Sequence, residues 1–298
     1  MPTGPETGAF LHSIYGPLVA AAQQVETLHQ NGSLVGIAIL GQPRSERFGP
    51  PESFVRLLRD PECDAALEWA HDLLTGDTFV LPPHCSLELD PTDRSLIAPM
   101  EQRGFGVAKL KLRGRVDHAL AHLKDKGVAP ASVDLTLSVP EAEQAVAINA
   151  LLRDFFAMHP ALGWGGPPAN AEQQAEIDRR ETKDLEQRLS TPPSSDFILC
   201  RAGKLLGYFG FTHQPNHPLL GSCGGVNIVL LPEIQGLGLG WMAYRHMVEA
   251  MHALGIETLY GSTSNPAVIR ISTRIGRRVA QFVLRRDGPF VSPALIPD

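Results

Sequence analysis

The sequence predicts a mixed α/β fold made of two similar domains. Three observations support this prediction. Apolar segments of strand length alternate with segments of helical periodicity, the 298 residues suffice for two domains of roughly 150 residues each, and the order of elements in the first half resembles that in the second. The hydrophobic content of 43% is ample for a buried core, so a chain that is disordered throughout is excluded.

In the first half, apolar residues alternate or recur at helical spacing in a regular order. The predicted elements are a helix around 18–29, strands at 34–40 and 54–58, a helix at 64–74, a strand at 86–90, a helix at 93–103, a strand at 107–113 and a short helix within 117–131. A Gly/Pro/Ser segment, GVAPAS, follows the lysines of that helix. We therefore expect one domain over residues 1–128 and a second over 129–298.

The second half begins with a strand at 133–139 and a helix whose apolar positions run from Ala145 to Phe156. Residues 159–196 form a polar excursion with a charged helix at 171–189, which suits a surface lid. Its Trp164 either lines a substrate site or anchors a surface loop. A hairpin is expected from 197–200 to 206–212, with its turn at Ala202 and Gly203.

A glycine-rich turn follows the next apolar strand, at 226–231. It contains Gly236, Gly238 and Gly240, precedes a helix that ends at Gly255, and is followed by another strand at 258–262. Such a turn exposes backbone N–H groups at the start of a helix, where they bind phosphate groups. The dinucleotide-binding fingerprint is excluded because Trp241 stands where its third glycine belongs, and no Lys-Ser/Thr pair follows the turn as in a P-loop.

The motif that fits is Gln-x-x-Gly-x-Gly, formed by Gln235, Gly238 and Gly240. Together with the segment N-P-A-V-I-R-I-S-T-R-I-G, from Asn265 to Gly276, it resembles the GCN5-related N-acetyltransferase (GNAT) family. The resemblance is clear over about residues 226–284 and extends more loosely back to Val133. It implies acetyl-CoA as a co-substrate and no metal.

The resemblance also implies which residues bind the cofactor. The turn from Gln235 to Gly240 would bind the pyrophosphate, and the backbone of Leu230 would pair with the extended pantetheine arm. The N–H groups near Leu230 and Leu231 would polarise the thioester carbonyl. The complete predicted cofactor set is Leu230, Leu231, Gln235, Gly236, Leu237, Gly238, Leu239, Gly240, Trp241 and Asn265.

The catalytic residues are harder to assign. Family members often use a tyrosine as the acid at the position that Ser272 occupies here, and Arg277 replaces the usual phenylalanine after the glycine. Tyr260 stands where some members carry a glutamate base, so its phenol either transfers a proton or packs there. Glu233, beside the turn, is a candidate base or an exposed loop carboxylate.

Other polar residues of the chain give weaker indications. His213 and Asn227 are candidates to line the substrate cleft, whereas a packing role is expected for Cys223. His118 and His122 have helical i, i+4 spacing but no third ligand in sequence, so we expect no metal site.

The first half resembles a degenerate copy of the second. Pro61-Glu62 can be aligned with Pro232-Glu233, but the glycines that follow are absent, and Glu62, Asp64 and Glu68 would repel a pyrophosphate. The tandem arrangement, and the segment F-F-A-M-H-P-A-L-G-W at 155–164, are similar to those of mycothiol synthases.

The expected function is transfer of acetyl from acetyl-CoA to a primary amine of a small molecule. Two alternatives stay open: a non-catalytic acyl-CoA-binding or scaffolding protein, and an acetyltransferase for peptide or protein amines. The net charge of −6 disfavours nucleic acid as a partner. No apolar stretch or signal peptide indicates a membrane, and four widely spaced cysteines favour the cytoplasm. We expect a monomer or a homodimer.

Overall fold

The computed structural model describes residues 15–43, 52–77, 79–124, 134–158, 170–191, 195–217, 219–286 and 290–296. The chain forms two compact units. The first comprises Met1–Glu46, Pro50–Leu110 and Ala280–Val291, and the second Arg47–Gly49, Lys111–Val279 and Ser292–Asp298. The predicted domain boundary between residues 128 and 129 lies outside the described residues, as does Trp164.

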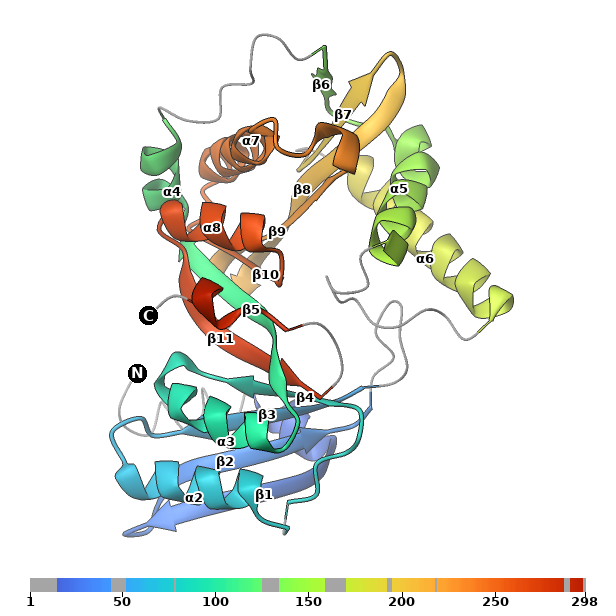
Figure 1. Ribbon diagram of the computed structural model, residues 1–298. Helices are drawn as coiled ribbons and strands as arrows, with labels where there is room; N and C mark the ends of the chain where they lie inside the picture. The colour runs from blue at the N-terminus through green and yellow to red at the C-terminus, as the bar shows by residue number, and fades with distance from the viewer. Residues whose placement is uncertain are drawn as a thin grey trace. The chain divides into compact units, whose positions relative to one another are not determined.

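The first unit contains a mixed sheet with two helices on one face (Figure 1). Strands β1 (Ala22–Gln30), β2 (Ser33–Gly41) and β3 (Ser53–Arg59) form an antiparallel meander, and β3 runs parallel to β4 (Cys85–Leu89). Helix α2 (Asp64–Thr75) joins β3 to β4, and the 3₁₀ helix η1 (Pro91–Leu96) and helix α3 (Ile97–Gln102) follow β4. The chain returns to this sheet late, because β11 (Arg278–Arg285) pairs antiparallel with β4.

The helix predicted around residues 18–29 is wrong. Residues 22–30 form strand β1, and only residues 15–20 are helical. The reason lies in the two residues that follow, since Asn31 and Gly32 both have positive φ angles, of 52° and 78°. An Asn-Gly pair in this conformation closes a two-residue hairpin and directs the preceding segment into antiparallel pairing with β2.

The second unit is a sheet covered on both faces. Strands β6 (Thr136–Ser138), β7 (Asp196–Arg201), β8 (Lys204–His217) and β9 (Gly221–Leu230) are antiparallel neighbours, and β10 (Thr258–Thr263) runs parallel to β9. The end of β5 (Gly106–Arg115) follows β10 in the strand order. The β7–β8 hairpin turns at Ala202 and Gly203, as predicted, with φ angles of 48° and 79°.

Helices pack against the second sheet from opposite sides. Helices α4 (Val116–Leu123) and α7 (Leu239–Ala253) bury Phe209 and Leu259, whereas α5 (Ala145–Met158) and α6 (Ala171–Leu189) bury Tyr208 and Val229. Because side chains alternate along a strand, this division shows for each site residue on β8, β9 and β10 which of the two faces it lies on. The remaining elements are η2 (Ala142–Gln144), η4 (Pro232–Ile234), α8 (Pro266–Arg274) and η5 (Pro293–Leu295).

The two halves of the chain repeat one order of elements. In the first half, β3, α2, the parallel strand β4, α3 and β5 follow one another, and in the second half β9, α7, the parallel strand β10, α8 and β11 do so. The repeat agrees with the predicted tandem arrangement. None of the helices in the described part of the chain is long and apolar enough to span a bilayer.

Candidate functional site

The glycines of the turn before α7 have two different structural roles. Gly236 and Gly238 adopt left-handed backbone conformations, with φ angles of 78° and 77°, which other residues rarely adopt. A Cβ atom at either position would meet nothing within 4 Å, so the space in front of the turn is open. Gly240 instead allows close packing, because a Cβ there would lie 2.8 Å from the Cδ1 atom of Ile271 on α8.

The turn presents a row of free backbone donors. Within the part of the chain that the structure describes, the N–H groups from Gly236 to Gly240 donate to no protein acceptor. They lie at the start of α7, where the helix dipole adds positive potential. This arrangement can bind an anion such as a phosphate or pyrophosphate.

The neighbouring side chains shape the turn. The Nε2 atom of Gln235 donates a hydrogen bond of 2.8 Å to the carbonyl of Leu230, which fixes the end of β9. Leu237 is exposed, and Trp241 packs against the core beneath α7. Asn265 caps α8, since its Oδ1 atom accepts from the N–H of Ala267 at 2.9 Å.

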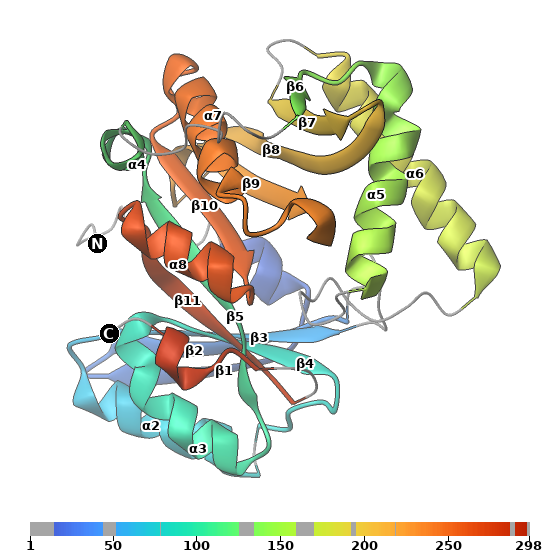
Figure 2. The same cartoon turned by 45° about the horizontal axis from the view of Figure 1, so that its top comes forward.

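Strands β9 and β10 separate beside this turn. They pair only at Thr258 with Cys223, Leu259 with Gly224 and Tyr260 with Gly225. Beyond those pairs the two strands diverge towards their carboxyl ends (Figure 2). Residues 226–230 of β9 therefore keep an unpaired edge that leads from Tyr260 to the glycine turn.

Hydrogen bonding to β8 determines which groups of β9 face the opening. The N–H of Leu231 donates to the carbonyl of Leu206 at 2.9 Å, so it is not available to a ligand. In an antiparallel pair the bonding direction alternates along the strand. The N–H groups of Leu230 and Ile228 consequently point away from β8 and into the opening.

Tyr260 lies at the point where the two strands part. Its hydroxyl group lies 2.8 Å from the position of a Cβ on Gly225, so the phenol covers the last paired residue of β9. Burial raises the pKa of Tyr260 above its usual value, and the nearby Cys223 raises it further. The phenol is therefore protonated at neutral pH and can donate a hydrogen bond or a proton.

His217 also belongs to this end of the site, although it is not among the predicted site residues. Its ring lies 6.3 Å from that of Tyr260, centroid to centroid. A bulge between Gln214 and His217 shifts the register of β8 and turns this side chain toward Tyr260. Its Nδ1 atom accepts from the N–H groups of Leu219 and Leu220, at 3.1 and 3.2 Å.

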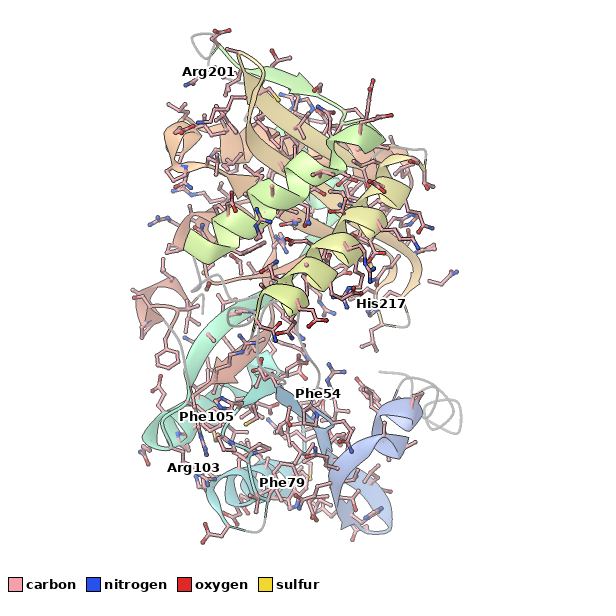
Figure 3. All side chains as sticks on the ribbon, turned by 90° about the vertical axis from the view of Figure 1, so that its right-hand side faces the viewer. Phe54, Phe79, Arg103, Phe105, Arg201 and His217 are labelled. Atoms are coloured by element: carbon pink, nitrogen blue, oxygen red, sulfur yellow. The ribbon has the colours of Figure 1, made fainter. Side chains whose placement is uncertain are left out.

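Glu233 lies at the other end of the site. Its carboxylate forms an ion pair with Lys204 at 2.8 Å, beside the hairpin turn that contains Arg201. Arg201 and His217 mark opposite ends of the β8 hairpin (Figure 3). The two predicted catalytic residues, Glu233 and Tyr260, therefore lie at opposite ends of the site, and Glu233 is paired with Lys204.

The other polar candidates divide between the faces of the sheet. His213 shares the face of Phe209, on the α7 side, and its Nε2 atom is 3.2 Å from the Oγ atom of Ser222. Asn227 lies opposite Gly210 on the face of Tyr208 and Tyr260. Among the described residues, no group of three or more His, Cys, Asp or Glu side chains could hold a metal ion.

Comparisons with known proteins add to this geometry. Residues 155–276 match the model of the acetyltransferase (GNAT) family. An acetyltransferase of this family from Colwellia psychrerythraea is 12% identical, with a TM-score of 0.51 over 93% of this chain and 95% of that chain. A GCN5-related N-acetyltransferase from Sphaerobacter thermophilus is 14% identical, with a TM-score of 0.52 over 90% and 82%. No curated protein sequence matches the chain. The predicted fold class is confirmed.

Proposed function

We propose that this chain, whose residues 155–276 match the acetyltransferase (GNAT) family, transfers acetyl from acetyl-CoA to a primary amine of a small molecule. Members of this family are acyltransferases that generally use acetyl-CoA. The observation that carries the proposal is the parting of β9 and β10 directly beside a turn of free amides. An extended, amide-bearing arm with a charged end fits such an edge and turn.

The proposal places the pyrophosphate on the amides between Gly236 and Gly240. The pantetheine arm then extends along the unpaired edge of β9, where Leu230 can bond its amide groups as an added strand would. The edge from Gly225 to Leu230 spans five residue-to-residue steps, or roughly 16 Å at about 3.3 Å per step. An extended arm of this length places the thioester beside Tyr260.

The reaction at that end needs a polarised carbonyl and a proton donor. The N–H group of Ile228 faces the opening closer to Tyr260 than that of Leu230 does, so we assign to it the polarisation of the thioester carbonyl. The neutral amine attacks this carbon, a C–N bond forms, and the C–S bond breaks. Tyr260 donates a proton to the sulfur, and the amine loses its extra proton to water. Glu233 has no role in this scheme.

The test is release of free thiol from acetyl-CoA in the presence of candidate acceptors. The panel contains small amines, aminoglycosides, amino-acid conjugates and short peptides, and a reaction without acceptor corrects for hydrolysis. Release that requires a small amine supports the proposal, and release only with peptides would replace the acceptor class. CoA binding without release above background with any acceptor would contradict the transferase and favour the acyl-CoA-binding alternative.

A further inference from the structure

The second unit contains a buried cation that this scheme does not use. Arg277 is only 3% exposed. Its Nη1 atom donates to the hydroxyl groups of Tyr244 and Ser272, each at 2.9 Å. Its Nη2 atom donates to the carbonyl of Leu112 at 2.8 Å and, more weakly, to that of Gly261 at 3.4 Å.

No carboxylate of the described ranges balances this charge. Among the described residues, Arg277 forms no ion pair, and its buried Nε atom has no hydrogen-bond partner. The hydroxyl groups of Tyr244 and Ser272 lie 3.1 Å apart, so one of them donates its proton to the oxygen of the other. The proton of the second hydroxyl group then has no acceptor within the network. The network therefore offers more donors than acceptors.

Such an arrangement lowers the stability of the folded protein, so stability does not explain its presence. Burial lowers the pKa of Arg277, but a guanidinium keeps its charge at neutral pH. A buried charge without a partner destabilises a protein, and a buried polar atom without a hydrogen bond adds to that cost. Groups of this kind gather where a ligand or a transition state supplies the missing opposite charge.

The guanidinium lies at the point where β9 and β10 part. Gly261 is the first residue of β10 beyond the last pair with β9. A Cβ on Gly261 would lie 3.2 Å from the Nη2 atom of Arg277 and 3.0 Å from Cγ2 of Val226, the first unpaired residue of β9. Because position 261 carries no side chain, the guanidinium of Arg277 can lie next to the gap between β9 and β10.

Arg277 and Tyr260 approach this point from opposite faces of β10. Tyr260 shares the face of Tyr208, on the side of α5 and α6. The hydroxyl partners of Arg277 come from α7 and α8, which flank β10 on the other side (Figure 2). Burial raises the pKa of both Tyr260 and Cys223, so these two groups are neutral at neutral pH. The ring of His217 lies beyond Tyr260. Among the groups named here, Arg277 is therefore the cation closest to the point where β9 and β10 diverge.

We propose that Arg277, held by Tyr244 and Ser272, stabilises the CoA thiolate that leaves when the acetyl group is transferred. The C–S bond breaks with its electron pair on sulfur, and the positive charge across Gly261 lowers the energy of that thiolate before Tyr260 protonates it. Arg277 does not touch the cofactor in this account and acts through space. The inference rests on the proposed function, because it requires the thioester to lie where β9 and β10 part.

The test measures the pKa of the thiol of CoA bound to the protein, from the ultraviolet absorbance of the thiolate during a pH titration. No acceptor is needed. We expect the pKa of the bound thiol to lie at least about one unit below that of free CoA, the effect of an opposite charge within roughly 6 Å. An unshifted thiol in a tight complex would overturn the inference and leave the proposed function standing, whereas failure to bind CoA would overturn both.

Variants separate the charge from the packing. Arg277→Met should return the thiol pKa to that of free CoA with little change in CoA affinity, and Arg277→Lys should keep part of the shift. Arg245→Met is the matched control, because Arg245 lies on α7 but pairs with Glu249 at 2.8 Å. An equal thiol pKa in wild type and Arg277→Met would overturn the inference.

One further variant covers the case in which Arg277→Met does not fold. Tyr244→Phe removes one hydroxyl that orients the guanidinium and keeps the ring. We expect it to raise the thiol pKa by a smaller amount, and a value equal to that of wild type would then count against the network.

Discussion

Gly238→Glu tests the pyrophosphate site most sharply, because the structure separates its effects. Any side chain at position 238 meets the same backbone strain, since φ is 77°. A residue other than glycine in this region costs roughly 1–2 kcal/mol. There is no steric clash to add, because a Cβ would meet nothing within 4 Å. Gly238→Gln therefore has the same shape and strain as Gly238→Glu without the charge.

The difference between these two variants is electrostatic. A unit charge 4 Å from another of the same sign costs about 1 kcal/mol in water and about 4 kcal/mol at an effective dielectric constant of 20. The turn is exposed, which favours the lower figure, but a pyrophosphate carries more than one charge. We therefore expect CoA to bind about 10- to 100-fold more weakly to Gly238→Glu than to Gly238→Gln.

Isothermal titration calorimetry with CoA measures this difference, and thermal unfolding of each variant checks the fold. A carboxylate at the start of α7 interacts favourably with the helix dipole, by about 0.3–1 kcal/mol. Gly238→Glu should thus be at least as stable as Gly238→Gln while binding CoA less tightly. Equal CoA affinities of the two variants would refute the assignment of the turn as the pyrophosphate site.

Three further predictions concern the acid and the first unit. Tyr260→Phe should reduce kcat about 100-fold with little change in KM for acetyl-CoA, because it removes the proton donor; wild-type turnover across pH would exclude the tyrosine from the mechanism. Asp93→Asn breaks an ion pair with Arg59 in which both side chains are at most 4% exposed, and should lower the free energy of unfolding by about 3–5 kcal/mol. The double variant Arg59→Met/Asp93→Leu should regain much of that loss in chemical denaturation, and a double variant as unstable as the single one would contradict this reasoning. Burial raises the pKa of Cys85 from 9.0 to about 11, so the unfolded chain loses this proton first as the pH rises. The free energy of unfolding should therefore fall between pH 9 and pH 11, by at most about 2.7 kcal/mol from this thiol; an equally steep fall in Cys85→Ala would assign the effect to other groups.

The sequence predicts best those elements that glycine or strong periodicity delimits. Helix α6 occupies the predicted residues 171–189, and Gly255 follows the end of α7 with a positive φ of 69°. The β7–β8 hairpin also lies where its Ala-Gly turn indicated. In each case a local preference and the global fold agree, so local reasoning suffices.

Strand β1 shows where local reasoning is not enough. Its segment, AQQVETLHQ, has few apolar residues, and four of its nine residues are exposed. Pairing with β2 through the Asn31–Gly32 turn makes it a strand, and this pairing is a tertiary effect. The pairing of β11 with β4 of the first unit likewise depends on contacts between residues that are distant in sequence, such as Phe282 with Leu89.

The candidate site divides in the same way. The turn at 235–240 could be predicted because its three glycines alternate over a short segment of the sequence, directly after strand β9. The partners of Arg277 could not, because Leu112 is 165 residues away along the chain. The ion pair between Glu233 and Lys204 joins residues 29 apart, and it weakens a role that sequence position alone made plausible.

The central claim is that acetyl-CoA lies between β9 and β10 with its sulfur beside Tyr260. A crystal structure of the protein with CoA tests it directly. We expect the pyrophosphate on the amides of residues 236–240, the pantetheine along the edge of β9 from Leu230 to Val226, and the sulfur between Tyr260 and Gly261. CoA bound elsewhere, or strands paired to their ends with no space for the arm, would contradict the account.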